Sequence, residues 1–344
     1  MWDRGSRVAV GIRTFSYHRA VLHVLNGDAT RLKLERSSVP GTFVVWADVL
    51  HDGPVPAGIS EDELTRLRAA HFAAQLDESE ATVLEMARGW NAALARYRDF
   101  TEVVFWLEHD LFDQLILLRH LDWLSSIDRT GTAFSLICIG AFPGVPRFFG
   151  LCPLTPEQLA TLLPQRTAIT ERQIALGAHG WSLFRASDPR PLFDWAAGDL
   201  PELPFVRGAL RRHFEDYPSL ANGLSRSERQ MLSTLRQRDL TFHELFAECQ
   251  NMEERVYMGD TTFRSILHGL AEGRNPLVRT AVQAATPPDW VRFALSDLGE
   301  VVLSGGADHV ELNGIDKWMG GVHLTSANPW RWDADSESLT LAEP

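Results

Sequence analysis

Short apolar runs alternate with longer amphipathic segments through the first 150 residues. Four of these runs are almost entirely apolar: residues 21–25, 43–47, 103–107 and 134–139. Strands that are buried on both faces have this pattern, and helices between them favour a parallel sheet. Helices are expected at residues 29–35, 60–75, 79–98 and 111–125. Ser60 followed by Glu63 has the form of a capping box. We therefore predict an α/β fold with an open, mostly parallel, Rossmann-like sheet.

The apolar and polar positions along the whole chain predict five segments. The predicted organisation is a leader at 1–19, the α/β domain at 20–150, a helical extension at 151–222, a winged-helix-like module at 223–304 and a Trp- and Gly-rich tail at 305–344. The leader lacks the apolar core of a signal peptide. We expect it to be disordered, or to precede the true start of translation.

The winged-helix prediction depends on the order of elements in residues 223–304. Helices are expected at 225–236, 241–249 and 260–272, with Asp260 or Thr261 as the cap of the third, and strands at 277–282 and 290–294. DNA recognition by this fold needs a basic face. Residues 224–281 contain eight arginines and eight acidic residues, which leaves no net charge. A packing or dimerisation role is therefore preferred to DNA contact, and homo-oligomer formation stays open.

Composition narrows the class of protein. The chain has 344 residues, 45% of them hydrophobic and 23% charged, which is the balance of an ordinary globular protein. The net charge of −12 disfavours general binding to phosphate backbones. Three cysteines without a CxxC pair indicate structural thiols in a reducing compartment. No apolar run reaches the roughly 18 residues of a membrane span. We expect a cytoplasmic protein with no membrane partner.

Polar residues follow the first predicted strand. Asn26, Gly27 and Asp28 lie where the strand passes into a helix, and glycine suits a sharp turn there. The first N–H groups of that helix could hold an anion. The segment has neither the GxGxxG spacing nor a P-loop, so a standard dinucleotide site is not indicated. The alternative is that Asp28 caps the helix.

The other two strand ends are more acidic. Asp48 and His51 follow the second strand, and His51 suits proton transfer, metal ligation or hydrogen bonding to its own loop. The third strand is followed by a dense group of polar residues: Glu108, His109, Asp110, Asp113 and Gln114. Capping of the next helix explains one or two of these carboxylates, because acidic groups suit a helix N-terminus. It does not explain all of them.

Carboxylates that converge from three strand ends repel one another unless a cation, a proton or an arginine intervenes. Oxygen ligands suit Mg²⁺ or Mn²⁺, which support phosphoryl chemistry. The predicted metal ligands are Asp48, Glu108 and Asp110. The predicted catalytic residues are His51, His109 and Glu108. The predicted ligand-binding residues are His23, Asn26, Gly27, Asp28, Asp48 and Gln114. The alternative is a site without metal that hydrogen-bonds a nucleotide or sugar.

Three ordered motifs carry a family resemblance. They are His23-x-Leu-Asn-Gly-Asp28, Trp46-x-Asp-Val-Leu-His-x-Gly-Pro54 and Trp106-x-Glu-His-Asp-Leu-x-Asp-Gln114. With Gly150-Leu-x-x-Leu154, this pattern resembles the bacterial domain-of-unknown-function family DUF1835 over roughly residues 20–200, and Cys152-Pro153 is a minor departure from it. The resemblance implies an α/β domain in a bacterial cytoplasmic protein, with the motif residues as a shared site. It implies no activity.

Three hypotheses about function remain at this point. In the first, the strand ends bind, hydrolyse or transfer a nucleotide or another phosphorylated molecule. In the second, the chain is a non-enzymatic regulator in which the α/β site senses a ligand and the winged helix contacts DNA or a protein. In the third, it is an interaction module without a small ligand. The sequence leaves open whether the protein is an enzyme.

Overall fold

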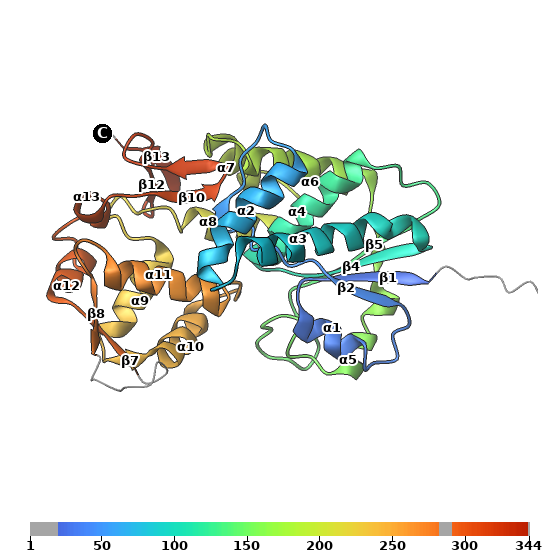
Figure 1. Cartoon of the computed structure of the whole chain (residues 1–344), viewed down its shortest axis with the longest axis horizontal. Helices are drawn as coiled ribbons and strands as arrows, with labels where there is room; N and C mark the ends of the chain where they lie inside the picture. The colour runs from blue at the N-terminus through green and yellow to red at the C-terminus, as the bar shows by residue number, and fades with distance from the viewer. Residues whose placement is uncertain (1–19, 282–290, 343–344) are drawn as a thin grey trace, which may run out of the picture.

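The computed structural model describes residues 20–281 and 291–342. Its central sheet has the strand order β2-β1-β4-β5-β6. The strands are β1 (Val21–Leu25), β2 (Thr42–Val45), β4 (Glu102–Glu108), β5 (Ala133–Ile139) and β6 (Thr167–Ala168). The first four are parallel, and β6 pairs antiparallel with β5. The predicted α/β class and the mostly parallel sheet are confirmed (Figure 1).

Helices cover both faces of this sheet (Figure 1). On one face lie α1 (Asp28–Leu34) and α5 (Pro156–Ala160), followed by the 3-10 helix η2 (Leu163–Gln165). On the other lie α2 (Glu61–Gln75), α3 (Glu80–Ala95), α4 (Leu111–Ser126) and α6 (Glu171–Phe184). The 3-10 helix η1 (Arg96–Asp99) leads from α3 into β4. The capping box predicted at the start of α2 is present.

Strand β4 shows how the two faces are built from one apolar run. Val103, Phe105 and Leu107 belong to the core under α4 and α6, whereas Val104 and Trp106 belong to the core under α1 and α5. Successive side chains of a strand point to opposite faces, so the run must be apolar throughout to be buried on both. The next residue in this alternation, Glu108, falls on the α1 side of the sheet.

The helical extension contains one element that was not predicted. The helices α7 (Arg190–Ala197) and α8 (Val206–Phe214) agree with the expected helical character. Residues 167–168 instead form β6, which covers the outer edge of β5. An unpaired edge strand exposes backbone N–H and C=O groups, and a short antiparallel strand satisfies some of them.

The C-terminal module follows the predicted order of elements. It consists of α9 (Arg226–Leu235), β7 (Leu240–Thr241), α10 (Phe242–Met252), α11 (Asp260–Glu272), β8 (Val278–Ala281), β9 (Arg292–Leu295) and α12 (Asp297–Leu303). The three strands form a sheet of order β7-β9-β8. Helix α11 is capped by Gly259 without a side-chain hydrogen bond, so the caps predicted at Asp260 or Thr261 were wrong. Residues 282–290, at the predicted tip of the wing, lie outside the described residues, and the winged-helix assignment stays a prediction.

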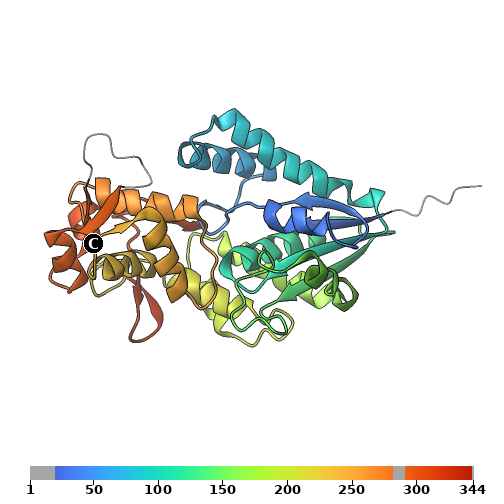
Figure 2. The ribbon, with the colours of Figure 1, turned by 90° about the horizontal axis from the view of Figure 1, so that it is seen from below.

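The tail returns to the α/β domain. After α13 (His309–Asn313) come β10 (Lys317–Gly320), β11 (Val322–Leu324), β12 (Trp330–Asp333) and β13 (Ser338–Leu341). Strand β10 pairs in parallel with β3 (Gly53–Pro54), which lies in the loop after β2. Trp330 and Trp332 are buried. Figure 2 shows the C-terminal part of the chain, in yellow to red, at one end of the molecule beside the α/β domain.

Across the described ranges, every helix is too short or too polar to cross a membrane.

Candidate functional site

The sheet has a topological switch point between β1 and β4. From β1, the chain passes to β2 on one side of that strand, and later returns as β4 on the other side. The loops that leave two such neighbouring strands diverge, and the crevice at their carboxyl ends is the common ligand site of open α/β sheets. Asn26 follows β1 at this crevice, and Glu108 ends β4 there.

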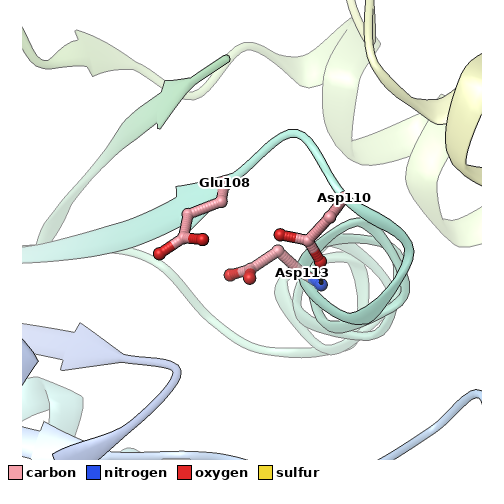
Figure 3. Close-up of side chains that lie close together, drawn as sticks. All are labelled: Glu108, Asp110 and Asp113. Carbon is pink, nitrogen blue, oxygen red and sulfur yellow. Dashed lines mark hydrogen bonds between the residues drawn. The ribbon is translucent and has the colours of Figure 1, made fainter. Parts of the chain in front are cut away.

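Three carboxylates meet at the end of β4. Glu108, Asp110 and Asp113 each place one oxygen within 4.8 Å of the oxygens of the other two. Figure 3 shows Glu108 extending from the strand and the two aspartates beside the first turn of α4, with the three groups pointing toward one another. Their exposed fractions are 7%, 3% and 1%. Buried carboxylates at this spacing require a compensating charge or proton.

Local structure brings the two aspartates together. Asp110 is the N-cap of α4, and its Oδ1 accepts a hydrogen bond from the backbone N–H of Asp113 at 3.1 Å. Asp113 also accepts a hydrogen bond on Oδ2 from Nδ2 of Asn26 at 2.8 Å. Its other oxygen, Oδ1, is buried without a hydrogen-bond partner. Capping therefore explains Asp110 and leaves Asp113 with a free acceptor.

Glu108 is held from two sides by backbone. Its Oε1 accepts a hydrogen bond from the N–H of Leu151 at 2.6 Å. Gly150 has φ +110°, and a Cβ atom there would lie 2.0 Å from Glu108 Oε2. Only glycine allows this approach without strain. The motif Gly150-Leu-x-x-Leu154 was part of the family resemblance. The sequence did not predict that this loop contacts Glu108.

Burial raises the pKa of all three carboxyl groups, and repulsion by a neighbouring carboxylate adds to the rise at Glu108 and Asp113. Burial and Asp110 raise the pKa of Glu108 to about 8. Burial raises the pKa of Asp110 to about 6. Burial, Asp110 and Glu108 raise the pKa of Asp113 well above its ordinary value. Within the described ranges, no arginine or lysine forms an ion pair with the cluster. Protons or a bound cation must therefore supply the missing positive charge.

Asp48 does not join this cluster. Its carboxylate forms hydrogen bonds of 2.5–2.8 Å with Nε and Nη2 of Arg68 on α2. Nη1 of Arg68 donates hydrogen bonds to the carbonyl oxygens of Asp52 and Pro54. The expected grouping of Asp48 with Glu108 and Asp110 as metal ligands is therefore not what the structure shows, because Asp48 turns to the opposite face and is neutralised there.

His109 lies next to the cluster in sequence, and His51 packs its ring against Phe112 of α4. Both imidazoles are buried, and burial lowers the pKa of each to about 4, so both are neutral at pH 7. His109 has an unpartnered Nδ1, and its ring contacts Phe205. Both ring nitrogens of His51 are unpartnered, and its ring packs against Tyr257 of the C-terminal part. Of the two, His109 is the histidine that lies between two of the carboxylates in sequence.

His23 is a structural residue. Nε1 of Trp106 donates to its Nδ1 at 3.0 Å, its Nε2 is 3.1 Å from the carbonyl oxygen of Pro40, and its ring stacks on Phe43. Both ring nitrogens are thus occupied inside the sheet's α1-side core. These contacts give His23 a structural role in the core, and its predicted ligand-binding role stays a prediction.

Gln114 is a buried residue that binds the backbone of Glu108. Its Nε2 donates to the backbone carbonyl oxygen of Glu108 and contacts Sγ of Cys138 at 3.3 Å. Gln114 is 2% exposed. Through this hydrogen bond Gln114 orients the end of β4, and its predicted direct contact with a ligand stays a prediction.

The start of α1 differs from the expected sharp glycine turn. Gly27 is the N-cap with an extended backbone, φ −175°, that any residue adopts. Asp28 is the first helical residue, is exposed and pairs with Arg31 at 2.9 Å, so it does not cap the helix. A Cβ atom at Gly27 would have no heavy atom within 4 Å. The structure therefore leaves open space beside Asn26.

Comparison of this chain with protein-family models and with curated proteins finds no match. The resemblance to the DUF1835 family stays a prediction, and the function has to be argued from the site itself.

Proposed function

We propose that this protein binds Mg²⁺ or Mn²⁺ through Glu108, Asp110 and Asp113, and through that cation a phosphorylated ligand such as a nucleotide. The observation that supports this most strongly is the group of three buried carboxylates at the switch point of the sheet, for which the described residues provide no basic partner. The free Oδ1 of Asp113 is the acceptor that a cation would use.

The donor set favours these metals. Carboxylate oxygens without cysteine or histidine suit hard cations rather than structural zinc. Mg²⁺ prefers six oxygen ligands and keeps several positions for water or substrate phosphate. If each of the three side chains supplies one oxygen, the remaining positions are available for a ligand. The open space beside Gly27 is the side from which the ligand would approach.

A cation at this place would also support chemistry on the ligand. It would polarise a phosphoryl oxygen or lower the pKa of a bound water. The neutral His109, next to Glu108 and Asp110 in sequence and with an unpartnered Nδ1, is the group that we propose would accept a proton. Binding is the function proposed, and hydrolysis or transfer is the reaction class to be assayed once binding is measured.

Thermal melting with metal tests the proposal. MnCl₂ or MgCl₂ should raise the melting midpoint of the full chain, because a ligand that binds the native state stabilises it. Asp113→Asn should abolish the rise. Asp122→Asn is the matched control, since Asp122 lies on the same helix outside the cluster. ADP or ATP added with Mn²⁺ should raise the midpoint further. No response of the wild-type protein to either metal would overturn the proposal.

A second candidate function, a ligand-sensing regulator, is favoured by contacts between the strand-end loops and the C-terminal module. Nη1 of Arg255 donates to the carbonyl oxygen of His109 at 3.2 Å. Thr262 Oγ1 donates to Asp52 at 3.3 Å. Through these two hydrogen bonds, binding of a ligand at the strand ends would change the conformation or stability of the C-terminal module. A change in hydrogen exchange of α11 on addition of Mn²⁺ and ATP would support this function, and an unchanged exchange pattern would exclude it.

The ion pairs of this module favour a protein partner over DNA. Several of its arginines are used in ion pairs: Arg226 with Glu215, Arg236 with Glu300, and Arg238 with Glu248. Phosphate contacts require basic groups that are free to release counterions. Weak retention on heparin at low salt would agree with this, whereas strong, salt-dependent retention would favour DNA.

A further inference from the structure

A cavity lies on the face of the sheet opposite the carboxylates. It has a volume of about 180 Å³ and is lined by the α2–α3 hairpin, the residues that follow β2, and the start of α11. Trp46 in its wall belongs to the core that includes Val103 and Phe105, whereas Glu108 follows the alternation of Val104 and Trp106 on the other face. The cavity is therefore separate from the proposed cation site.

The wall of the cavity is mostly apolar and partly aromatic. The apolar lining includes Trp46, Leu64, Phe72, Val83, Met86 and Trp90. An apolar cavity of roughly 150 Å³ holds a benzene-sized molecule. Aromatic side chains favour an aromatic ligand through stacked and edge-to-face contacts. The size and the wall thus fit a single aromatic ring with a short substituent.

One polar group in this wall has an unused donor. Arg119 is 6% exposed, and its Nη1 has no hydrogen-bond partner. Its guanidinium lies 4.7 Å from the ring of Trp46. Its Nη2 pairs with Glu61, whose side chain is 52% exposed. A buried donor without an acceptor is unfavourable, so the geometry calls for an acceptor at Nη1.

The other ion pair in the wall offers no such donor. Arg68 uses Nε and Nη2 on Asp48, and uses Nη1 on two backbone carbonyl oxygens. Asp48 is neutralised by that pair and does not attract a cationic ligand. The recognition chemistry of the cavity therefore rests on Arg119, which prefers a carboxylate because charge-assisted hydrogen bonds to arginine are the stronger ones.

We propose that this cavity binds a small aromatic carboxylate. The ring would lie among Trp46, Phe72 and Trp90, and the carboxylate would accept a hydrogen bond from Arg119 Nη1. The exposed Glu61 would rotate toward solvent as the ligand takes its place beside the guanidinium. This inference does not depend on the function proposed for the carboxylate cluster.

Binding of benzoate, phenylacetate and 3-phenylpropionate to the full chain tests the proposal. Isothermal titration calorimetry and ligand-observed NMR should show saturable binding of at least one of them. Benzyl alcohol, which keeps the ring without the charge, should bind about tenfold more weakly, the difference expected for one charge-assisted hydrogen bond. If none of the three acids binds, or if the alcohol binds as well as the acids, the proposal is wrong.

Variants assign the binding to this cavity. Glu61→Gln should strengthen binding of the acid about threefold or more, because it removes the carboxylate that competes for the buried guanidinium of Arg119. Ala87→Phe should abolish binding by filling the cavity. Arg119→Met should weaken it about tenfold. Arg88→Met is the matched control, since Arg88 is an exposed arginine on α3 that pairs with Asp62 and does not line the cavity.

The outcomes remain interpretable if Arg119→Met fails to fold. Glu61→Gln changes an exposed side chain, and its melting midpoint provides the check on folding. Unchanged binding in both Glu61→Gln and Ala87→Phe would place the ligand elsewhere and overturn the proposal. Asp113→Asn should leave the binding of the acid intact, which separates this site from the cation site.

Discussion

The side-chain amide of Asn26 donates a hydrogen bond to Oδ2 of Asp113 at 2.8 Å. This bond joins the residue after β1 to the first turn of α4 across the switch point of the sheet, and it connects residues 87 positions apart in the chain. It shows that the acidic residues after β4 are part of a crevice between two strands and do not serve only as the N-terminal charge of α4.

Asn26→Asp should place a fourth carboxylate in the crevice. The metal-free variant should lose about 1–3 kcal/mol of stability, because a hydrogen bond to Asp113 is replaced by repulsion. Mn²⁺ should restore that loss and should give a larger rise in melting midpoint than it gives the wild type. Asn26→Ser is the control without added charge. A variant that is destabilised equally with and without Mn²⁺ would contradict the cation site.

Cation binding at pH 7 should release protons, about one of them from Glu108. Glu108, with its pKa raised to about 8, is mostly protonated in the metal-free protein at this pH, and Asp113 shares the same direction of shift. Calorimetry in Pipes and Tris buffers, which differ in ionisation enthalpy, measures the number of protons released. Glu108→Gln should lower that number by about one. Identical binding enthalpies in the two buffers would show that no proton is displaced.

The same shift gives the metal-free protein a stability that falls as the pH rises. A carboxyl group whose folded pKa is raised contributes most stability below its ordinary pKa of 4.5, and this contribution is lost as the pH rises through about 8. Urea unfolding at pH 6.5 and pH 8.5 should show the loss in the wild type and a smaller one in Glu108→Gln. Saturating Mn²⁺ should remove the difference between the two pH values.

Gly150→Ala should be strongly destabilising. The substitution strains a backbone at φ +110° and places a methyl group against Glu108 Oε2, so a loss of more than about 2 kcal/mol is expected. Gly131→Ala is the matched control, because Gly131 has φ +84° with no heavy atom near the added Cβ. The difference between the two variants measures the contact with Glu108. Equal losses would mean that backbone strain alone is responsible.

His120→Phe should stabilise the protein, most strongly at acidic pH. His120 stacks on Phe105 at 4.8 Å, both of its ring nitrogens lack partners, and burial lowers its pKa well below 6.5. A histidine with a lowered folded pKa contributes stability above pH 6.5 and loses it as the pH falls. The variant should gain about 1 kcal/mol at pH 7 and more at pH 5. Denaturant unfolding at both values checks this, and a pH-independent difference would contradict it.

Asp48→Asn should destabilise the protein without affecting cation binding. The substitution leaves Arg68 buried without its charged partner, which costs about 3 kcal/mol. If Asp48 were a metal ligand, the variant would instead lose its response to Mn²⁺. Melting with and without Mn²⁺ distinguishes these results. The control is Asp62→Asn, which changes an exposed aspartate on α2, the helix that carries Arg68.

Much of the fold could be predicted because buried strands and helices show a characteristic local pattern of apolar residues. The apolar run in β4 and the amphipathic helices around it mark a parallel sheet whatever the order of its strands. Strand β6 shows no such pattern, because two exposed residues at a sheet edge, Thr167 and Ala168, carry no periodic signal. The pairing of β10 with β3 was equally invisible, since it joins short segments that are far apart in the chain.

The sequence by itself determined the acidic group after β4, because Glu108, Asp110 and Asp113 are close in the chain and are placed by one strand end and one helix start. Tertiary structure alone decided which other residues reach that group. In the folded chain, Asn26 and Leu151 donate hydrogen bonds to the carboxylates. Asp48 instead forms an ion pair with Arg68, and His23 accepts a hydrogen bond from Trp106 in the core. The physical reason is that hydrophobic periodicity encodes which positions are buried, whereas the partners of a buried polar group depend on strand order and on which face of the sheet each chain segment crosses.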